Sequence, residues 1–264
     1  MRAFTVATHN EGFLHSLQDS ARKYGYQLSV LGLHEEWKGF VWRWQLLLDT
    51  LQGLPSEELV LVLDGYDTVI TAPSACLELQ YRVKCEAADR LMFGLEHRKE
   101  HCTRAFWWLS EVFRRYHSVG ADLPIVNAGV CVGPARLVRQ LCREMQAAAK
   151  ELKEAKPDDQ RILNTLIAKH AKDKKTGIAV GLLEGLHCHC ERSMWGPLRH
   201  LYTNVPYIPP GPVSYGNHRV EVRIGTRMAR VFVVHGIWCT HLGPICDALA
   251  RAVERRAQVK HGFR

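Results

Sequence analysis

Apolar and polar residues alternate along the first part of the chain in a way that predicts strands and helices in turn. Strands are predicted at Ala3–Thr8, Gln27–Leu31 and Glu58–Leu63. The last of these is almost continuously apolar, which is typical of a central parallel strand. Apolar residues at helical spacing predict helices over Gly12–Tyr24 and Trp42–Leu51 between the strands. Strands that alternate with helices favour βαβ units and a mostly parallel sheet.

The rest of the chain continues this alternation with longer polar interruptions. A strand is predicted at Leu123–Val132, and Pro134 suits the first position of a helix that runs to Leu152. Asp158 is placed to cap the next helix. The other predicted elements are a helix at Ser74–Leu91, a strand at Met92–Leu95, an aromatic-rich helix at Ala105–Tyr116, a hairpin around Gly225, a strand at Val231–Val234 and a closing helix marked by Ile245, Leu249 and Val253.

These elements predict an α/β fold with a mostly parallel central sheet flanked by helices. The chain has 264 residues, which is enough for one large domain, and no internal repeat or linker divides it. Ligands of open parallel sheets bind outside the carboxyl ends of the strands. Polar residues that follow strands are therefore the first candidates for a functional site.

Two aspartates follow the most apolar strand. Asp64 and Asp67 lie three residues apart around Gly65, so their carboxylates can converge on a hard cation such as Mn²⁺ or Mg²⁺. A metal ion there can bridge two phosphates and neutralise a leaving diphosphate. The alternative is a turn in which aspartate caps the backbone and glycine supplies conformational freedom.

One of the histidines, His235, follows the last predicted strand and precedes Gly236. Mn²⁺ accepts an imidazole ligand more readily than Mg²⁺ does, so His235 can complete the metal site if it lies beside Asp64 and Asp67. The alternative is a structural histidine at a strand end. The chain has no GxGxxG, GxxxxGK[ST] or GxSxG motif, which leaves dinucleotide, P-loop and serine-hydrolase chemistry unsupported.

Charge narrows the class of partner only slightly. The net charge is +8, and much of the surplus lies in Arg219–Arg230 and Arg251–Arg264. Neither stretch is a nucleic-acid-binding motif, so solvated surface charge is the preferred interpretation and no nucleic acid is expected. No apolar run is long enough to cross a bilayer, and no secretory signal precedes the first strand, which predicts a cytoplasmic chain or a domain of a longer protein.

Cysteine and histidine residues leave one metal alternative open. The nine cysteines have no framework spacing, which predicts reduced thiols. A zinc site would need two separated ligand pairs, and the spacings available are tight for one, so a Cys/His-rich loop is the preferred interpretation. The residues concerned are His187, Cys188, His189 and Cys190, with Cys239 and His241 as the second pair.

Six segments that occur in order make the chain resemble a known family. It resembles the glycosyltransferase domain of the procollagen-lysine hydroxylases, a GT-A-type fold with relatives among collagen galactosyltransferases and large-virus enzymes. The segments are Phe4–Thr8, Leu31-Gly32 with Glu35–Gly39, Asp64–Ile70, Asn127–Gly133, Asp158-Asp159-Gln160 and Val234-His235-Gly236.

The resemblance implies a single glycosyltransferase domain over residues 1–264. Residues 1–120 would mainly bind the nucleotide of UDP-glucose or UDP-galactose. Residues 121–264 would form the smaller, irregular acceptor side and carry the late metal-binding strand and the closing helix. The acceptor would be a hydroxyl group, either hydroxylysine of a collagen-like chain or a glycan. Neither inversion nor retention of the sugar is indicated.

The resemblance also implies a role for each candidate residue. Asp64, Asp67 and His235 would bind Mn²⁺ or Mg²⁺, with Asp64 also beside the nucleotide. Thr8 would contact the uridine, Trp37 and Tyr66 would stack on the uracil, and Arg43 would pair with the diphosphate. Asn127 and Asp159 would face the sugar or the acceptor, with Asp159 as the candidate base.

The chain departs from the family pattern in three places. The glycine-rich stretch is shortened to Gly39–Trp42, Ala128 replaces a serine, and the loop Glu96–Glu100 differs. These departures bear on the sugar and the acceptor more than on the nucleotide site. Two alternative functions follow: a degenerate nucleotide-sugar-binding module without turnover, and a metal-dependent phosphohydrolase that uses the same Asp, Asp and His residues.

Overall fold

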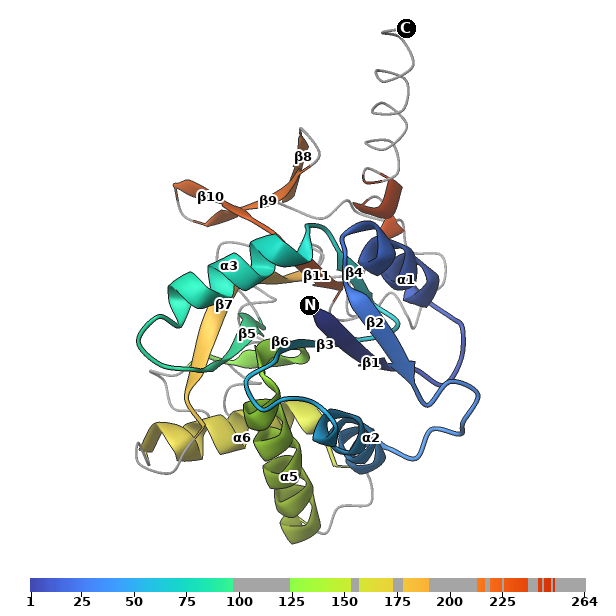
Figure 1. The fold of residues 1–264 in the computed structure, drawn as a ribbon, viewed down its shortest axis with the longest axis vertical. Coiled ribbons are helices and arrows are strands. Elements are labelled where there is room, and N and C mark those ends of the chain that lie inside the picture. The colour runs from blue at the N-terminus through green and yellow to red at the C-terminus, as the bar shows by residue number, and fades with distance from the viewer. Residues whose placement is uncertain are drawn as a thin grey trace, which may run out of the picture.

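The computed structural model describes residues 1–96, 124–152, 157–172, 178–189, 213–216, 219–224, 226–236, 242–243, 245–247 and 249. Within them, helices cover both faces of an eight-stranded sheet, and a three-stranded sheet lies beside it (Figure 1). The predicted α/β fold is confirmed. No helix in the described part of the chain is long and apolar enough to span a membrane.

The large sheet is mixed but mostly parallel. Its order is β2 (Gln27–Leu31), β1 (Arg2–Val6), β3 (Leu59–Asp64), β6 (Val126–Pro134), β5 (Leu91–Leu95), β7 (Val180–His189), β11 (Val233–Gly236) and β4 (Thr68–Ile70). The pairs β1–β2, β1–β3, β5–β7 and β7–β11 are parallel. Strand β6 runs antiparallel to β3 and β5, and β4 runs antiparallel to β11.

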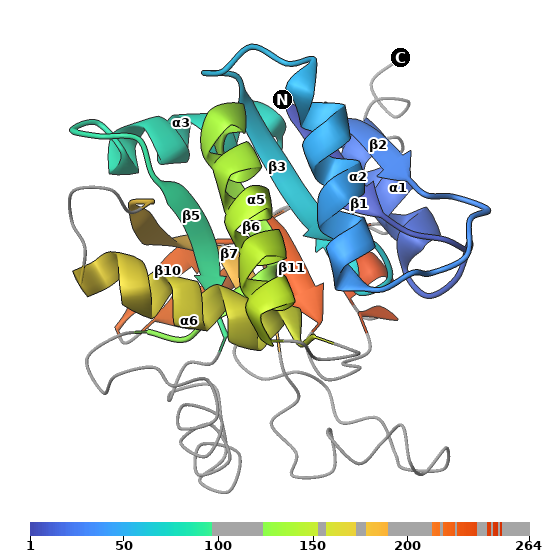
Figure 2. The same cartoon turned by 90° about the horizontal axis from the view of Figure 1, so that it is seen from below.

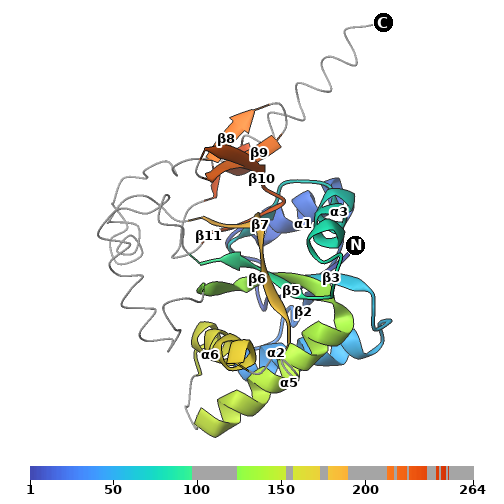
Figure 3. The same ribbon diagram turned by 90° about the vertical axis from the view of Figure 1, so that its left-hand side faces the viewer.

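Two apolar layers enclose this sheet. Helices α2 (Phe40–Gln52), α5 (Ala135–Leu152) and α6 (Asp159–Lys172) cover one face (Figure 2). Helices α1 (Leu14–Lys23) and α3 (Ser74–Lys84) cover the other (Figure 3). Strand β3 packs into both layers. Val60 and Val62 face the layer with α2, α5 and α6, and Leu61 and Leu63 face the layer with α1 and α3. Burial on both faces is why this strand is apolar from Leu59 to Leu63.

A third, smaller core joins the end of the chain to the sheet. Buried residues of β4, β9 (Arg219–Ile224) and β11 pack there against Leu242, Ile245 and Leu249. Strand β9 lies between β8 (Val213–Gly216) and β10 (Arg227–Arg230) in the three-stranded sheet. The antiparallel pair β9–β10 confirms the predicted hairpin around position 225.

Several predicted boundaries were wrong, and tertiary contacts explain them. Helix α3 ends at Lys84 rather than Leu91, because the Tyr81 hydroxyl donates to the Arg90 carbonyl at 2.8 Å and the chain turns back into β5. Pro134 closes β6 instead of opening α5. His235 lies inside β11 rather than after it. The predicted helix Ala105–Tyr116 lies outside the described residues.

Three strands, β4, β7 and β8, were not predicted. Strand β4 has three residues, and its strand partner among the described residues is β11, so its extended form depends on a segment far along the chain. Strand β7 carries His187, Cys188 and His189 at its end, so these residues belong to a strand and not to a loop. Cys190, Cys239 and His241, which the zinc alternative needs, lie outside the described residues.

One buried amide fixes α6 against β6. The Asn164 side chain accepts a hydrogen bond from the Val126 backbone N–H at 2.9 Å and donates one to the Val126 carbonyl at 3.0 Å. Asp158 caps the same helix, as predicted, by accepting from the Arg161 N–H at 3.3 Å. Asn164 therefore sets how the start of α6, with Asp159, lies relative to Asn127 on β6.

We expect Asn164→Ala to lower the free energy of unfolding by about 3 kcal/mol, because it removes the side-chain partner of the buried Val126 N–H and leaves a cavity. Urea unfolding followed by circular dichroism measures this. Lys169→Ala, at an exposed position of the same helix, is the control and should change stability by less than about 0.5 kcal/mol. Equal effects of the two variants would contradict this account of the helix contact.

Candidate functional site

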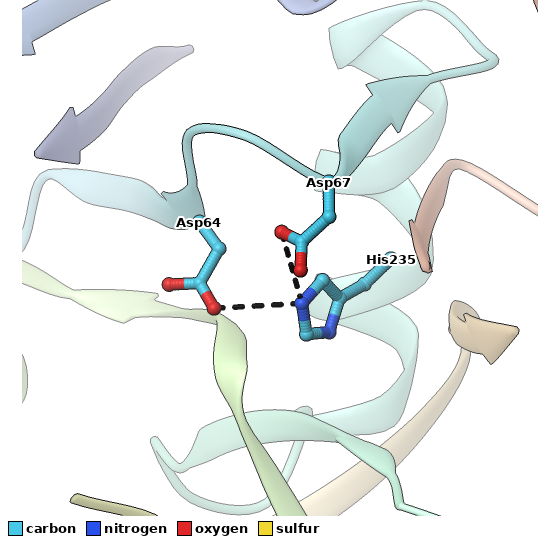
Figure 4. A group of neighbouring side chains, drawn as sticks. All are labelled: Asp64, Asp67 and His235. Carbon is cyan, nitrogen blue, oxygen red and sulfur yellow. Dashed lines mark ion pairs between the residues drawn. The ribbon is translucent and has the colours of Figure 1, made fainter. Parts of the chain in front are cut away.

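Asp64, Asp67 and His235 converge on one point, as Figure 4 shows. The His235 Nε2 atom lies 3.4 Å from an Asp64 carboxylate oxygen and 3.2 Å from one of Asp67. The pairing of β11 with β4 creates this approach: His235 lies opposite Thr68, and the Gly236 N–H donates to the Asp67 carbonyl at 2.7 Å. Residues far apart in sequence thus meet at the carboxyl end of β3.

The donor set fits a divalent cation. One potential ligand atom from each residue lies within 4.8 Å of the others, and the set combines two carboxylates with one imidazole. His235 is 5% exposed. Both of its ring nitrogens are buried, and neither makes a hydrogen bond to the described residues. A buried nitrogen without a hydrogen bond, facing two carboxylates, is suited to metal ligation.

Electrostatics favour positive charge between these groups. Burial lowers the pKa of His235, but Asp67 and Asp64 outweigh burial and raise that pKa well above its usual value. Burial raises the pKa of Asp64, but Arg43 and His235 outweigh it and hold that pKa below its usual range. The two aspartates therefore favour a cation at this position, either a proton on the imidazole or a metal ion.

Gly129 closes the other side of the cluster. A Cβ atom at this position would lie 2.6 Å from an Asp64 carboxylate oxygen and 2.7 Å from the His235 Nε2 atom. Both distances are far below van der Waals contact. The middle of the Asn127–Gly133 segment therefore needs glycine because the backbone of β6 passes directly against the cluster.

The loop after β1 is held by Tyr66. The Tyr66 hydroxyl accepts hydrogen bonds from the backbone N–H groups of Thr8 at 2.8 Å and His9 at 3.1 Å. The structure thus brings Thr8 and Tyr66 together. Trp37 lies in a separate aromatic cluster, edge-on to Phe40 and Trp42 with ring centroids 5.6 Å away, and is 44% exposed.

Arg43 lies next to the cluster and contacts two acids. Its guanidinium is 2.5 Å from Asp64 and 3.4 Å from Asp159. Burial raises the pKa of Asp159 to about 6, although Arg43 opposes this rise. Two predicted site residues, Arg43 and Asp159, are therefore both connected to the Asp64 carboxylate.

Glu96 is a candidate site residue that was not identified from the sequence. It was named there only as the first residue of the loop that differs from the family pattern. Its carboxylate accepts a hydrogen bond from the Asn127 side chain at 2.5 Å. Burial raises the pKa of Glu96 to about 7, against the opposing effects of Asn127 and His235. Glu96 follows directly after β5. The rule that polar residues follow the strands of a binding edge would have identified it.

We expect Gly129→Ala to weaken Mn²⁺ binding about tenfold or more, because the added methyl group displaces Asp64 or His235. The free Mn²⁺ signal in electron paramagnetic resonance measures this binding. Gly53→Ala is the matched control, since a Cβ there meets nothing within 4 Å. Unchanged Mn²⁺ affinity in a folded Gly129→Ala variant would show that the metal ion binds elsewhere.

Comparison with known proteins also points to a glycosyltransferase domain. The family described as the PLOD GT domain matches residues 1–179. The multifunctional procollagen lysine hydroxylase and glycosyltransferase of Caenorhabditis elegans is 27% identical over 181 residues. That alignment covers 65% of this chain and 23% of the worm protein, so the chain spans only a part of that relative.

Solved structures share the fold. The crystal structure of the galactosyltransferase LgtC with donor and acceptor sugar analogues superposes with a TM-score of 0.52 at 13% identity, over 97% of this chain and 96% of LgtC. An active-site mutant of LgtC gives a TM-score of 0.51 at 14% identity with the same coverage. The family match over residues 1–179 and the shared fold show that this chain belongs to the PLOD GT-domain family and has a glycosyltransferase domain of GT-A type.

Proposed function

We propose that this chain is a metal-dependent hexosyltransferase that moves glucose or galactose from a UDP-sugar to a hydroxyl acceptor. The observation that carries the proposal is the convergence of Asp64, Asp67 and His235 beside the loop that Tyr66 holds. Membership of a glycosyltransferase family supports the transfer chemistry. The hydroxylase and glycosyltransferase activity in the name of the worm relative supports hydroxylysine of a collagen-like chain as the acceptor, with a glycan as the alternative.

The residues around the cluster suit a nucleotide diphosphate. Asp64, Asp67 and His235 would hold a divalent cation, with Mn²⁺ favoured over Mg²⁺ by the imidazole, and the cation would supply charge neutralisation for the leaving diphosphate. Thr8 and the backbone that Tyr66 holds would contact the uridine. The exposed Trp37 ring offers an aromatic face for the uracil, together with Tyr66.

Asp159 is the proposed base for the acceptor hydroxyl. A side chain that takes a proton near neutral pH works best with a pKa close to that pH, and burial raises the pKa of Asp159 to about 6. The Asn127 side chain is held by its hydrogen bond to Glu96, so it can orient a sugar hydroxyl. In this arrangement the acceptor proton passes to the Asp159 carboxylate as the acceptor oxygen attacks the anomeric carbon, the bond from that carbon to the β-phosphate oxygen breaks, and UDP leaves with the electron pair.

We expect the native chain to release UDP from one UDP-sugar in the presence of Mn²⁺ and a hydroxylysine-containing peptide. Asp67→Ala should lower this release at least about a hundredfold because it removes a metal ligand. The exposed Asp49→Ala variant is the control. UDP binding without release from any donor would favour the nucleotide-sugar-binding module. Donor breakdown that survives Trp37→Ala and needs no acceptor would favour the phosphohydrolase.

The pH dependence of turnover identifies the base. Only the carboxylate form of Asp159 accepts a proton, so kcat at saturating Mn²⁺ and donor should fall about tenfold for each pH unit below about 6. Asp159→Asn should lower kcat about a hundredfold at pH 7.5. An inflection near pH 7 that disappears in Glu96→Gln would assign the base to Glu96 instead.

A further inference from the structure

We infer that Arg43 is a positioning residue, which joins the metal-binding Asp64 to the proposed base Asp159, and that it does not bind the diphosphate. This inference rests on the proposed function, because it assigns Arg43 a role within that site. It differs from the expectation that the family resemblance raised, in which Arg43 pairs with the nucleotide.

The geometry of the guanidinium supports a bridge. Its Nη2 atom lies 2.5 Å from the Asp64 Oδ1 atom, and its Nη1 atom lies 3.4 Å from the Asp159 Oδ2 atom. The two terminal nitrogens thus face carboxylates from two different elements, the end of β3 and the first residue of α6. A planar fork with fixed donor directions can hold two acids at once, whereas a lysine ammonium is a single point charge.

The surroundings of Arg43 fix it in this position. The residue is 7% exposed and lies at the start of α2. The small cavity beside it is lined mainly by apolar side chains, among them Trp44, Leu47 and Phe93. A cation against an apolar wall needs its paired acids, because breaking one pair leaves an uncompensated buried charge. Arg43 therefore has little freedom to leave the carboxylates for an incoming phosphate.

The bridge orients the ligating oxygen of Asp64. Arg43 engages Oδ1, while Oδ2 faces His235 at 3.4 Å. Contacts of this kind to a metal-binding side chain set its direction before the metal ion arrives. The same guanidinium holds the Asp159 carboxylate, so the proposed base keeps a fixed distance from the metal-binding strand. A change at Arg43 should therefore act on the chemical step, where both acids are used.

The test compares Arg43→Lys and Arg43→Gln with the native chain. UDP affinity at saturating Mn²⁺ is measured by isothermal titration calorimetry, and kcat and KM for the donor are measured with the acceptor peptide, also at saturating Mn²⁺. We expect both variants to lower kcat at least about tenfold while the Kd for UDP changes less than about threefold. Arg139→Lys, which replaces a half-buried arginine of α5, controls for the general effect of this exchange.

A double-mutant cycle on kcat distinguishes the proposed role of Arg43 from a purely structural one. If Arg43 acts partly through Asp159, Arg43→Lys should lower kcat by a smaller factor in the Asp159→Asn background than in the native chain, because only its effect through Asp64 remains. Fully additive losses in kcat would contradict the bridge.

Two other outcomes separate the inference from the proposed function. A Kd for UDP that rises tenfold or more in Arg43→Gln, with kcat unchanged in Arg43→Lys, overturns the inference and makes Arg43 a diphosphate ligand. A native chain that binds no UDP with Mn²⁺ overturns the proposed function itself. Arg43→Lys keeps the buried charge, so it remains informative if Arg43→Gln fails to fold.

Discussion

The antiparallel pairing of β4 with β11 is the contact on which the site depends. Strand β4 is short and follows Asp67 directly, and β11 carries His235 in register with Thr68. Without this pairing the aspartates would lie on an ordinary turn after a buried strand. With it, the imidazole of β11 reaches one carboxylate at the end of β3 and a second just before β4, where burial makes each charge depend on its neighbours.

Charges of alternating sign run through this region as one connected network. His235 faces Asp64, Asp64 faces Arg43, and Arg43 faces Asp159. Each of these four side chains is less than about a third exposed. Each group is costly to bury alone and tolerable only beside its partners. The network therefore ties together β3, β11, α2 and α6, which approach the site from different parts of the fold.

The sequence was most informative where local pattern and burial agree. The strand β3 and the position of Asp64 at its end follow from an apolar run that is typical of a strand covered on both faces, and β2 was predicted to the residue. Strands β4 and β7 escaped prediction because their extended form depends on partners distant in sequence. The proximity of His235 to Asp64, and of Arg43 to Asp159, is likewise a property of the folded sheet. Sequence could name these residues as candidates, through position and family resemblance, but the order of the strands and the packing of α2 and α6 on one face of the sheet bring them together.

The sequence separation between β3 and β11 has a consequence for biosynthesis. Asp64 and Asp67 leave the ribosome well before His235, because β5, β6 and β7 lie between them in the chain. The nascent chain can form the β1–β2–β3 unit from local parallel crossovers, but the imidazole arrives after a long loop has closed. The cluster of Asp64, Asp67 and His235 is therefore completed only when β11 pairs with β4, and a chain that lacks β11 would carry both acids without the imidazole.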